Sequence, residues 1–298
     1  MKKLLSSVFI AITLTGSSYA LTDLQACFNQ FNAGNYQQAV QYGQKAVIEY
    51  PKNPKAYFCL GKAYTQTGQI DKSIESFKKA SEYDSNDHDL MYIYNWLGGL
   101  YEVKGDHSNA LFYESKSLKL ARRFGDVDVE ESDLNNMANI FADEGNDSKA
   151  LEYYKKALEL ENGKSQTGAI YNNIANVYSD MHNYKKAIEY YKKAINVAEE
   201  NGHYLRSGEG MLNLGDTYRE VKDFKDAKLY LEKGLERVKK VGNKYWEGFG
   251  YRYFGLYYRD IGNKALAKEY LTKAYNIFKA IGDSGHTLTV IHDLSSIK

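Results

Sequence analysis

The chain has 298 residues, with 39 lysines and arginines against 38 aspartates and glutamates. This balance argues against a nucleic-acid or anionic-membrane surface, because both need a basic excess. Only two prolines occur, Pro51 and Pro54, so the chain can be helical almost throughout.

The N-terminus has the features of a targeting segment. Two lysines precede an apolar run over residues 4–14, which is too short to span a bilayer as a helix. Ser18 and Ala20 occupy the small-residue positions that a signal peptidase recognises. We therefore expect residues 1–20 to be a bacterial-type signal peptide cleaved after Ala20. The mature protein would then be periplasmic or secreted, with no membrane insertion.

A self-similar unit of two amphipathic helices recurs seven times in the rest of the chain. A small residue marks the start of each second helix: Ala39, Ser73, Ala110, Ala150, Ala187, Ala227 and Ala267. From the second unit on, a hydrophobic–small pair and an aromatic residue precede the marker, as in Leu60-Gly61 with Tyr64. A turn residue separates the two helices of each unit: Gly34, Gly68, Gly105, Gly145, His182, Lys222 and Gly262. Glycine there favours the left-handed conformation that ends a helix.

Two stretches carry this pattern almost completely: LGKAYTQTGQIDKSIESFKKA at residues 60–80 and YNNIANVYSDMHNYKKAIEYYKKA at residues 171–194. They resemble the tetratricopeptide repeat family over residues 21 to about 280. The period lengthens toward 40 residues, which is similar to kinesin light chains and Rap-type regulators. The resemblance implies an all-α, right-handed α-solenoid of seven helix pairs with a C-terminal capping helix. The expected units span 21–53, 54–87, 91–125, 131–163, 168–202, 208–242 and 248–282, and the cap spans 286–298.

Cys27 and Cys59 are the only cysteines. Residues 24–27 resemble a lipoprotein box, but the apolar run ends too early for one. An oxidising compartment would permit a disulfide. However, first helices of adjacent units usually lie about 8–10 Å apart, and a disulfide needs Cα atoms within about 7 Å. We therefore expect two small thiols in the core rather than a bridge.

The sequence contains no catalytic constellation. Its six histidines are scattered, mostly at turns, and none has a metal-binding spacing. No phosphate loop or nucleophile motif occurs, and three aspartates at residues 84–89 fit a solvated turn better than a calcium loop. We expect no enzyme, no cofactor and no metal.

The candidate binding residues lie on the first helices, beside their core face. Asparagine is a poor helix former, yet units four to six place several in mid-helix. An amide offers both donors and an acceptor, so a row of amides can bind the backbone of an extended peptide. The pattern resembles the asparagine ladders of kinesin light chain, of O-GlcNAc transferase and of Rap-type proteins. The residues expected to bind peptide are Asn135, Asn136, Asn139, Asn172, Asn173, Asn176, Asn213, Asp216, Arg219, Arg252, Tyr253 and Arg259. The alternative is that the amides bond to one another or to water.

Charged residues lie one turn further along these helices. Four acids in register would form an acidic edge for basic ligand side chains: Asp143, Asp180, Glu220 and Asp260. An acidic ligand group would then face Arg252 and Arg259. Phe58, Tyr92 and Trp96 are candidates for holding an apolar anchor. Ordinary solvated charges and packing between repeats explain the same residues equally well.

These observations predict an exported adaptor that binds a peptide or an extended partner segment in its concave groove. The alternative is a component of an envelope-assembly or secretion machine that holds a folded partner by its convex surface or ends. A peptide-sensing regulator is a third option, but it requires an effector domain or a bound partner. The sequence gives no oligomeric state.

Overall fold

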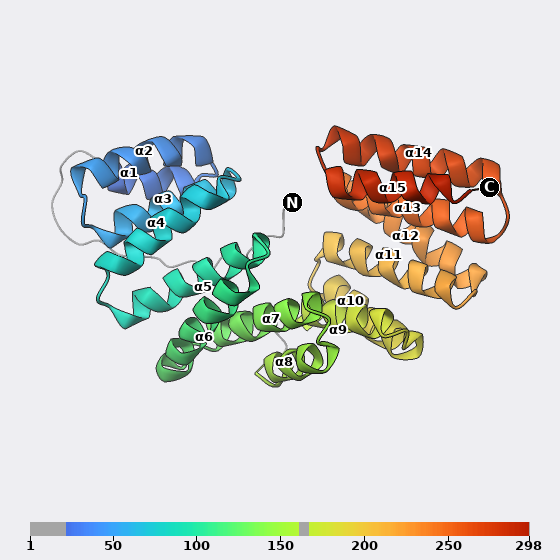
Figure 1. Cartoon of the computed structure of the whole chain (residues 1–298), viewed down its shortest axis with the longest axis horizontal. Helices are drawn as coiled ribbons and strands as arrows, with labels where there is room; N and C mark the ends of the chain where they lie inside the picture. The colour runs from blue at the N-terminus through green and yellow to red at the C-terminus, as the bar shows by residue number, and fades with distance from the viewer. Residues whose placement is uncertain (1–21, 161–166, 298) are drawn as a thin grey trace. The chain divides into compact units, whose positions relative to one another are not determined.

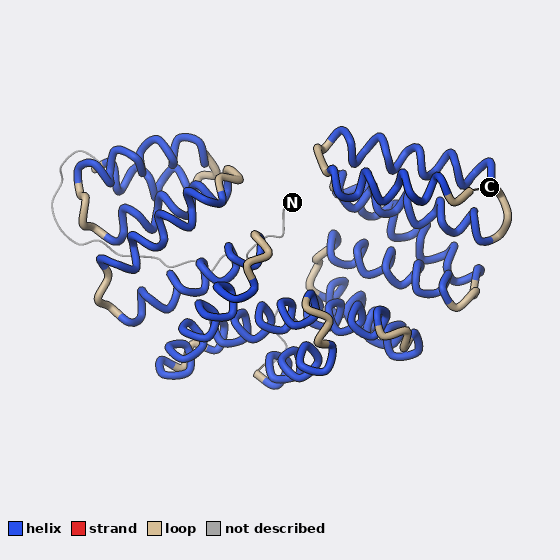
Figure 2. The backbone as a smooth tube through the Cα atoms, viewed as in Figure 1, coloured by secondary structure: helices blue, strands red, loops and turns tan. Residues whose placement is uncertain are grey.

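The computed structural model describes residues 22–160 and 167–297, and the expected signal peptide lies outside these ranges. The described residues form fifteen α-helices and no strand, which confirms the all-α prediction (Figures 1 and 2). None of these helices is long and apolar enough to cross a membrane. Two compact units divide the chain, one on either side of residue 160.

The N-terminal unit contains four helix pairs. Its helices are α1 (Asp23–Asn32), α2 (Tyr36–Glu49), α3 (Pro54–Gln66), α4 (Ile70–Tyr83), α5 (Asp87–Val103), α6 (His107–Phe124), α7 (Val127–Asp143) and α8 (Asp147–Glu159). Each first helix packs against the second helix of its own pair, and each second helix packs against the first helix of the next pair. First helices also contact each other, as α1 does with α3 and α5 with α7. The first helices therefore form one side of the unit.

The C-terminal unit contains three further pairs and a single last helix. Its helices are α9 (Thr167–Asp180), α10 (Tyr184–Glu200), α11 (Tyr204–Glu220), α12 (Phe224–Val241), α13 (Lys244–Asp260), α14 (Lys264–Ala280) and α15 (Ser284–Ser295). Val290 of α15 is fully buried in a cluster with Leu271 and Phe278 of α14. The last helix thus covers the apolar face of the seventh pair, as expected of a cap.

Small residues allow the two helices of a pair to approach closely. A Cβ atom added at Gly255 would lie 2.5 Å from Leu271 Cγ, and one added at Gly215 would lie 2.8 Å from Leu231 Cγ. The expected turn glycines all have positive φ, as do His182 (φ 56°) and Lys222 (φ 62°). The turn geometry is therefore kept even where glycine is absent, at a cost in backbone energy.

Four of the longer units begin one turn earlier than we predicted. Their first helices start at Asp87, Val127, Tyr204 and Lys244. In three of them a side chain before the helix caps it, since Asn86, Asp126 and Asn243 accept from the amides of His88, Val129 and Trp246. Capping satisfies a backbone donor that would otherwise lack a partner, and so extends the helix.

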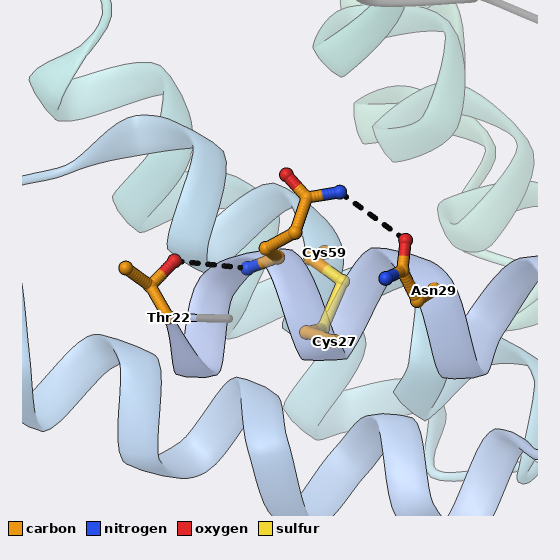
Figure 3. Close-up of a disulfide and its surroundings, with 5 residues drawn as sticks. Thr22, Cys27, Asn29 and Cys59 are labelled. Atoms are coloured by element: carbon orange, nitrogen blue, oxygen red, sulfur yellow. Dashed lines mark hydrogen bonds between the residues drawn. A yellow bond between two sulfur atoms is a disulfide. The ribbon is translucent and has the colours of Figure 1, made fainter. Parts of the chain in front are cut away.

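The expectation of two separate thiols was wrong. Cys27 of α1 and Cys59 of α3 form a disulfide with a Cα–Cα distance of 6.4 Å (Figure 3). The usual spacing of about 8–10 Å separates helix axes, whereas Cα atoms lie about 2.3 Å out from each axis, so ordinary packing brings facing Cα atoms within the range of a disulfide. Gly43 of α2 contributes to this packing, because a Cβ atom there would lie only 3.2 Å from Cys27 Sγ. Both cysteines are fully buried.

Candidate ligand-binding surface of the first helices

Asn139 and Asn176 occupy the same position in successive units, and a core tyrosine holds each of them. The Tyr154 hydroxyl donates to Asn139 Oδ1 at 2.6 Å, and the Tyr191 hydroxyl donates to Asn176 Oδ1 at 2.6 Å. Burial raises the pKa of both tyrosines far above the usual value, so they remain donors. The half-buried Asn176 makes no other bond with a described residue, so its amide nitrogen can donate to a ligand. Two neighbouring predicted residues are also half-buried and already interact within the chain: Asn135 and Asn173.

Three other predicted asparagines are buried between repeats instead. Asn136 Nδ2 donates to Glu114 of the preceding pair at 3.0 Å. Asn213 Oδ1 accepts from the Tyr253 hydroxyl of the following pair at 3.4 Å. Asn172 is 7% exposed, and its Oδ1 has no hydrogen-bond partner within the described part of the chain. Asn172 Nδ2 donates to Glu209 of the following pair at 3.4 Å, so all three amides bond to side chains of neighbouring repeats, which neither sequence interpretation had considered.

The charged residues at the ends of α11 and α13 neutralise one another. Arg219 is only 6% exposed and lies 2.7 Å from Asp216 and 2.6 Å from Asp260. It also pairs with Glu220, and Arg259 pairs with Asp260 at 2.9 Å. Burial raises the pKa of Asp216 even though Arg219 opposes the shift. Two of the four residues of the predicted acidic edge, Glu220 and Asp260, therefore belong to a compact ion-pair network that joins two first helices.

Arg252 has a comparable internal role. Its Nε lies 2.7 Å from Asp293 of α15, and both side chains are largely buried. The pair attaches the last helix to the seventh unit. An acidic ligand group at Arg252 would have to compete with Asp293. Within the described residues, no group of histidine, cysteine and acidic side chains has the arrangement of a metal site.

In the N-terminal unit, the first-helix side carries a lysine in aromatic surroundings. Lys62 Nζ lies 4.3 Å from the ring centroid of Phe31, 5.8 Å from that of Phe58 and 5.9 Å from that of Trp96. Burial lowers the pKa of Lys62. The expected apolar anchors Phe58 and Trp96 are thus brought together, whereas Tyr92 donates to Asp126. The repeat pattern in the sequence places Lys62 on the first-helix side, but it does not reveal the aromatic rings around it.

A second unexpected feature is a pair of buried acids. Glu114 of α6 and Asp133 of α7 are both fully buried, and each has one oxygen without a hydrogen-bond partner among the described residues. Asn136 donates to Glu114, and Asn95 donates to Asp133 at 2.8 Å. Burial raises the pKa of Asp133 to about 7 and that of Glu114 well above its usual value. The sequence feature that corresponds to this pair is the double glycine at residues 98–99. A Cβ atom at Gly98 would lie 2.3 Å from Glu114 Oε1, so only glycine leaves room for the buried acid.

Comparisons with known proteins identify the family to which this architecture belongs. Four tetratricopeptide repeat models match residues 30–92, 134–166, 166–240 and 254–280, about two thirds of the chain. Photosystem I assembly protein Ycf3 of Prochlorococcus marinus (strain NATL1A) is 38% identical over 99 residues, which are 33% of this chain and 51% of that protein. The chain therefore spans about half the length of this relative.

Two solved structures show the same fold. The apo form of RapI aligns with a TM-score of 0.68 and 14% identity, over 92% of this chain and 84% of that one. A Rap protein complexed with Competence and Sporulation Factor aligns with a TM-score of 0.62 and 14% identity, over 92% and 96%. The repeat models and the helix pairs agree over most of the sequence. The chain therefore belongs to the tetratricopeptide repeat family and is a scaffold of the protein-interaction type.

Proposed function

We propose that this protein is an exported scaffold that binds an extended segment of a partner protein along its first helices. The observation that carries the proposal is the Tyr191–Asn176 hydrogen bond. Tyr191 fixes the amide in one orientation and leaves its nitrogen as a donor. A donor held in place before binding loses little conformational freedom when it meets a backbone carbonyl. The Rap protein solved with Competence and Sporulation Factor has a related fold and supports a ligand-binding role.

Export is supported by two independent features. Residues 1–20 have the composition of a signal peptide. The Cys27–Cys59 disulfide is of a kind that persists mainly in oxidising compartments. Cell fractionation tests this part of the proposal. Full-length protein in the cytosol with residues 1–20 still attached would refute it.

Site-specific photocrosslinking in cells tests the binding surface. A photoreactive residue at Asn173, which is half-buried on α9, should give a partner adduct that mass spectrometry identifies. The matched control places the same residue at Asn196, which is exposed on the second helix of the same pair. Asn176→Ala should then reduce the adduct at position 173. Adducts from position 196 alone would refute binding by the first helices.

The second-helix side supports the alternative, in which a folded partner binds the convex surface. In the C-terminal unit an open hollow of about 320 Å³ lies between α12, α13 and α14. Its lining combines aromatic and charged side chains: Glu232, Leu235, Glu236, Lys239, Phe254, Tyr258 and Tyr270. Such a surface fits the amphipathic contacts of a protein interface. The control crosslinker at Asn196 and a further one at Glu236 would detect this partner.

A further inference from the structure

Lys62 occupies the position that Asn139 and Asn176 hold in later repeats. All three follow the hydrophobic residue of the first-helix pair by two positions. In the later repeats the opposing second-helix residue is a tyrosine that bonds to the asparagine. In the second repeat that residue is Phe77, which has no polar group. Lys62 therefore faces the same side of its unit without a core partner.

The surroundings of the Lys62 ammonium are apolar on several sides. Phe31 comes from α1, Phe58 from α3 and Trp96 from α5, so three consecutive first helices contribute rings. Phe77 fixes two of these rings, since it packs edge-on against Phe58 and stacks on Trp96. No described residue forms a hydrogen bond or ion pair with Lys62, and no carboxylate among these residues offsets the loss of hydration.

Such an ammonium is only partly stabilised in the free protein. Cation–π contacts offset part of its desolvation, but a half-buried charge without a counter-ion remains unfavourable. A carboxylate supplied by a ligand would provide the missing counter-ion and a charge-assisted hydrogen bond. The rings on both sides leave apolar surface for a neighbouring ligand side chain.

We propose that Lys62, Phe31, Phe58 and Trp96 form a subsite that receives a glutamate or aspartate side chain of the bound segment, with an apolar residue beside it. This subsite rests on the proposed function, because it requires a segment that runs along α1, α3 and α5. An internal side chain is the fitting source of the carboxylate, since the rings of α1 and α5 lie on either side of Lys62 and allow the segment to continue both ways.

An array of acetylated and amidated 12-residue peptides tests the subsite, because blocked ends leave only side-chain carboxylates. The mature disulfide-bonded protein should select peptides with an acidic residue next to an aromatic or aliphatic one. Replacing that glutamate by glutamine in a selected peptide should weaken binding about tenfold or more. Lys62→Gln should remove this difference, and Lys62→Arg should retain most of it. Lys149→Gln is the matched control. Lys149 is exposed on a second helix, and its Nζ lies 4.4 Å from the ring centroid of Phe141.

The possible outcomes separate the subsite from the general function. If peptides bind but the glutamate-to-glutamine change costs as much in Lys62→Gln as in the wild type, the subsite is refuted while peptide binding stands. If peptides bind without any preference for acidic residues, the same conclusion follows. If no peptide binds, the proposed function and the subsite both fail. Thermal unfolding of each variant verifies that the comparison involves folded protein.

Discussion

Replacing Asp133 by asparagine should stabilise the N-terminal unit at alkaline pH. In the wild type, Glu114 and Asp133 are buried together, and each has an oxygen without a partner among the described residues. Protonation of the pair supplies donors for these oxygens, but Asp133 loses its proton as the pH rises. An asparagine amide at this position can donate to Glu114 at every pH while its oxygen still accepts from Asn95. The substitution therefore supplies a permanent donor where the wild type has a titrating one.

The magnitude follows from the pKa of Asp133. Burial raises it from 3.8 to about 7. A carboxyl whose pKa is higher in the folded state than in the unfolded state contributes most to stability at low pH, and this contribution is lost as the pH rises toward the folded-state value. Between pH 5 and pH 8 the loss is on the order of 3 kcal/mol for this group. For a unit of this size, that corresponds to a fall in Tm of roughly 10 °C.

Thermal unfolding of the mature protein at pH 5 and pH 8 checks this expectation. Asp133→Asn should match the wild type at pH 5 and exceed it by about 3 kcal/mol at pH 8. Other acids near the pair, Glu102 and Asp126, are unchanged and add only a common background. The control Glu152→Gln changes an exposed glutamate and should shift Tm equally at both pH values. A wild type whose Tm does not fall between pH 5 and pH 8, or a variant that is destabilised equally at both, would refute the reasoning.

Three further predictions concern stability. Lys222→Gly should raise the free energy of unfolding by about 1 kcal/mol, because Lys222 has a φ of 62°; no gain in chemical denaturation would contradict this. Gly215→Ala should lower it by about 1–3 kcal/mol, since the added Cβ would lie 2.9 Å from the Leu231 backbone nitrogen; an unchanged Tm would show that the helices can separate freely. Replacing Cys27 and Cys59 by alanine should cost the N-terminal unit about 3–4 kcal/mol, because their disulfide closes a separation of 32 residues. Reducing agent should lower the Tm of the wild type but not of this double variant, and equal sensitivity would refute the assignment.

The repeat was predictable because its determinants are local. The position of Gly255 requires a small residue because two helices cross closely there, and the turn position of Gly262 requires a residue that tolerates positive φ. Both requirements recur at every unit, so the period reveals them. Even the departures at His182 and Lys222 adopt the expected conformation. The number and order of helices follow directly from this pattern.

The polar partners were less predictable, because they depend on contacts between elements. The sequence placed Asn176 on the first helix, but the Tyr191 hydroxyl that holds it comes from the second helix. Arg219 was expected to face a ligand, yet it lies between two acids of different helices. The disulfide was missed because the typical spacing refers to helix axes, and facing Cα atoms lie closer together than the axes do. Peptide contact by the predicted residues remains a proposal.

The cross-link between α1 and α3 changes how the N-terminal end can open. A stack of repeats normally frays from its ends, because a terminal pair has only one neighbour. Here α1 cannot move away from a folded α3, since the disulfide between Cys27 and Cys59 joins them. Hydrogen exchange at this end should therefore show the first two pairs opening as one cooperative block. The boundary of the first independently unfolding segment then lies after α4 rather than after α2.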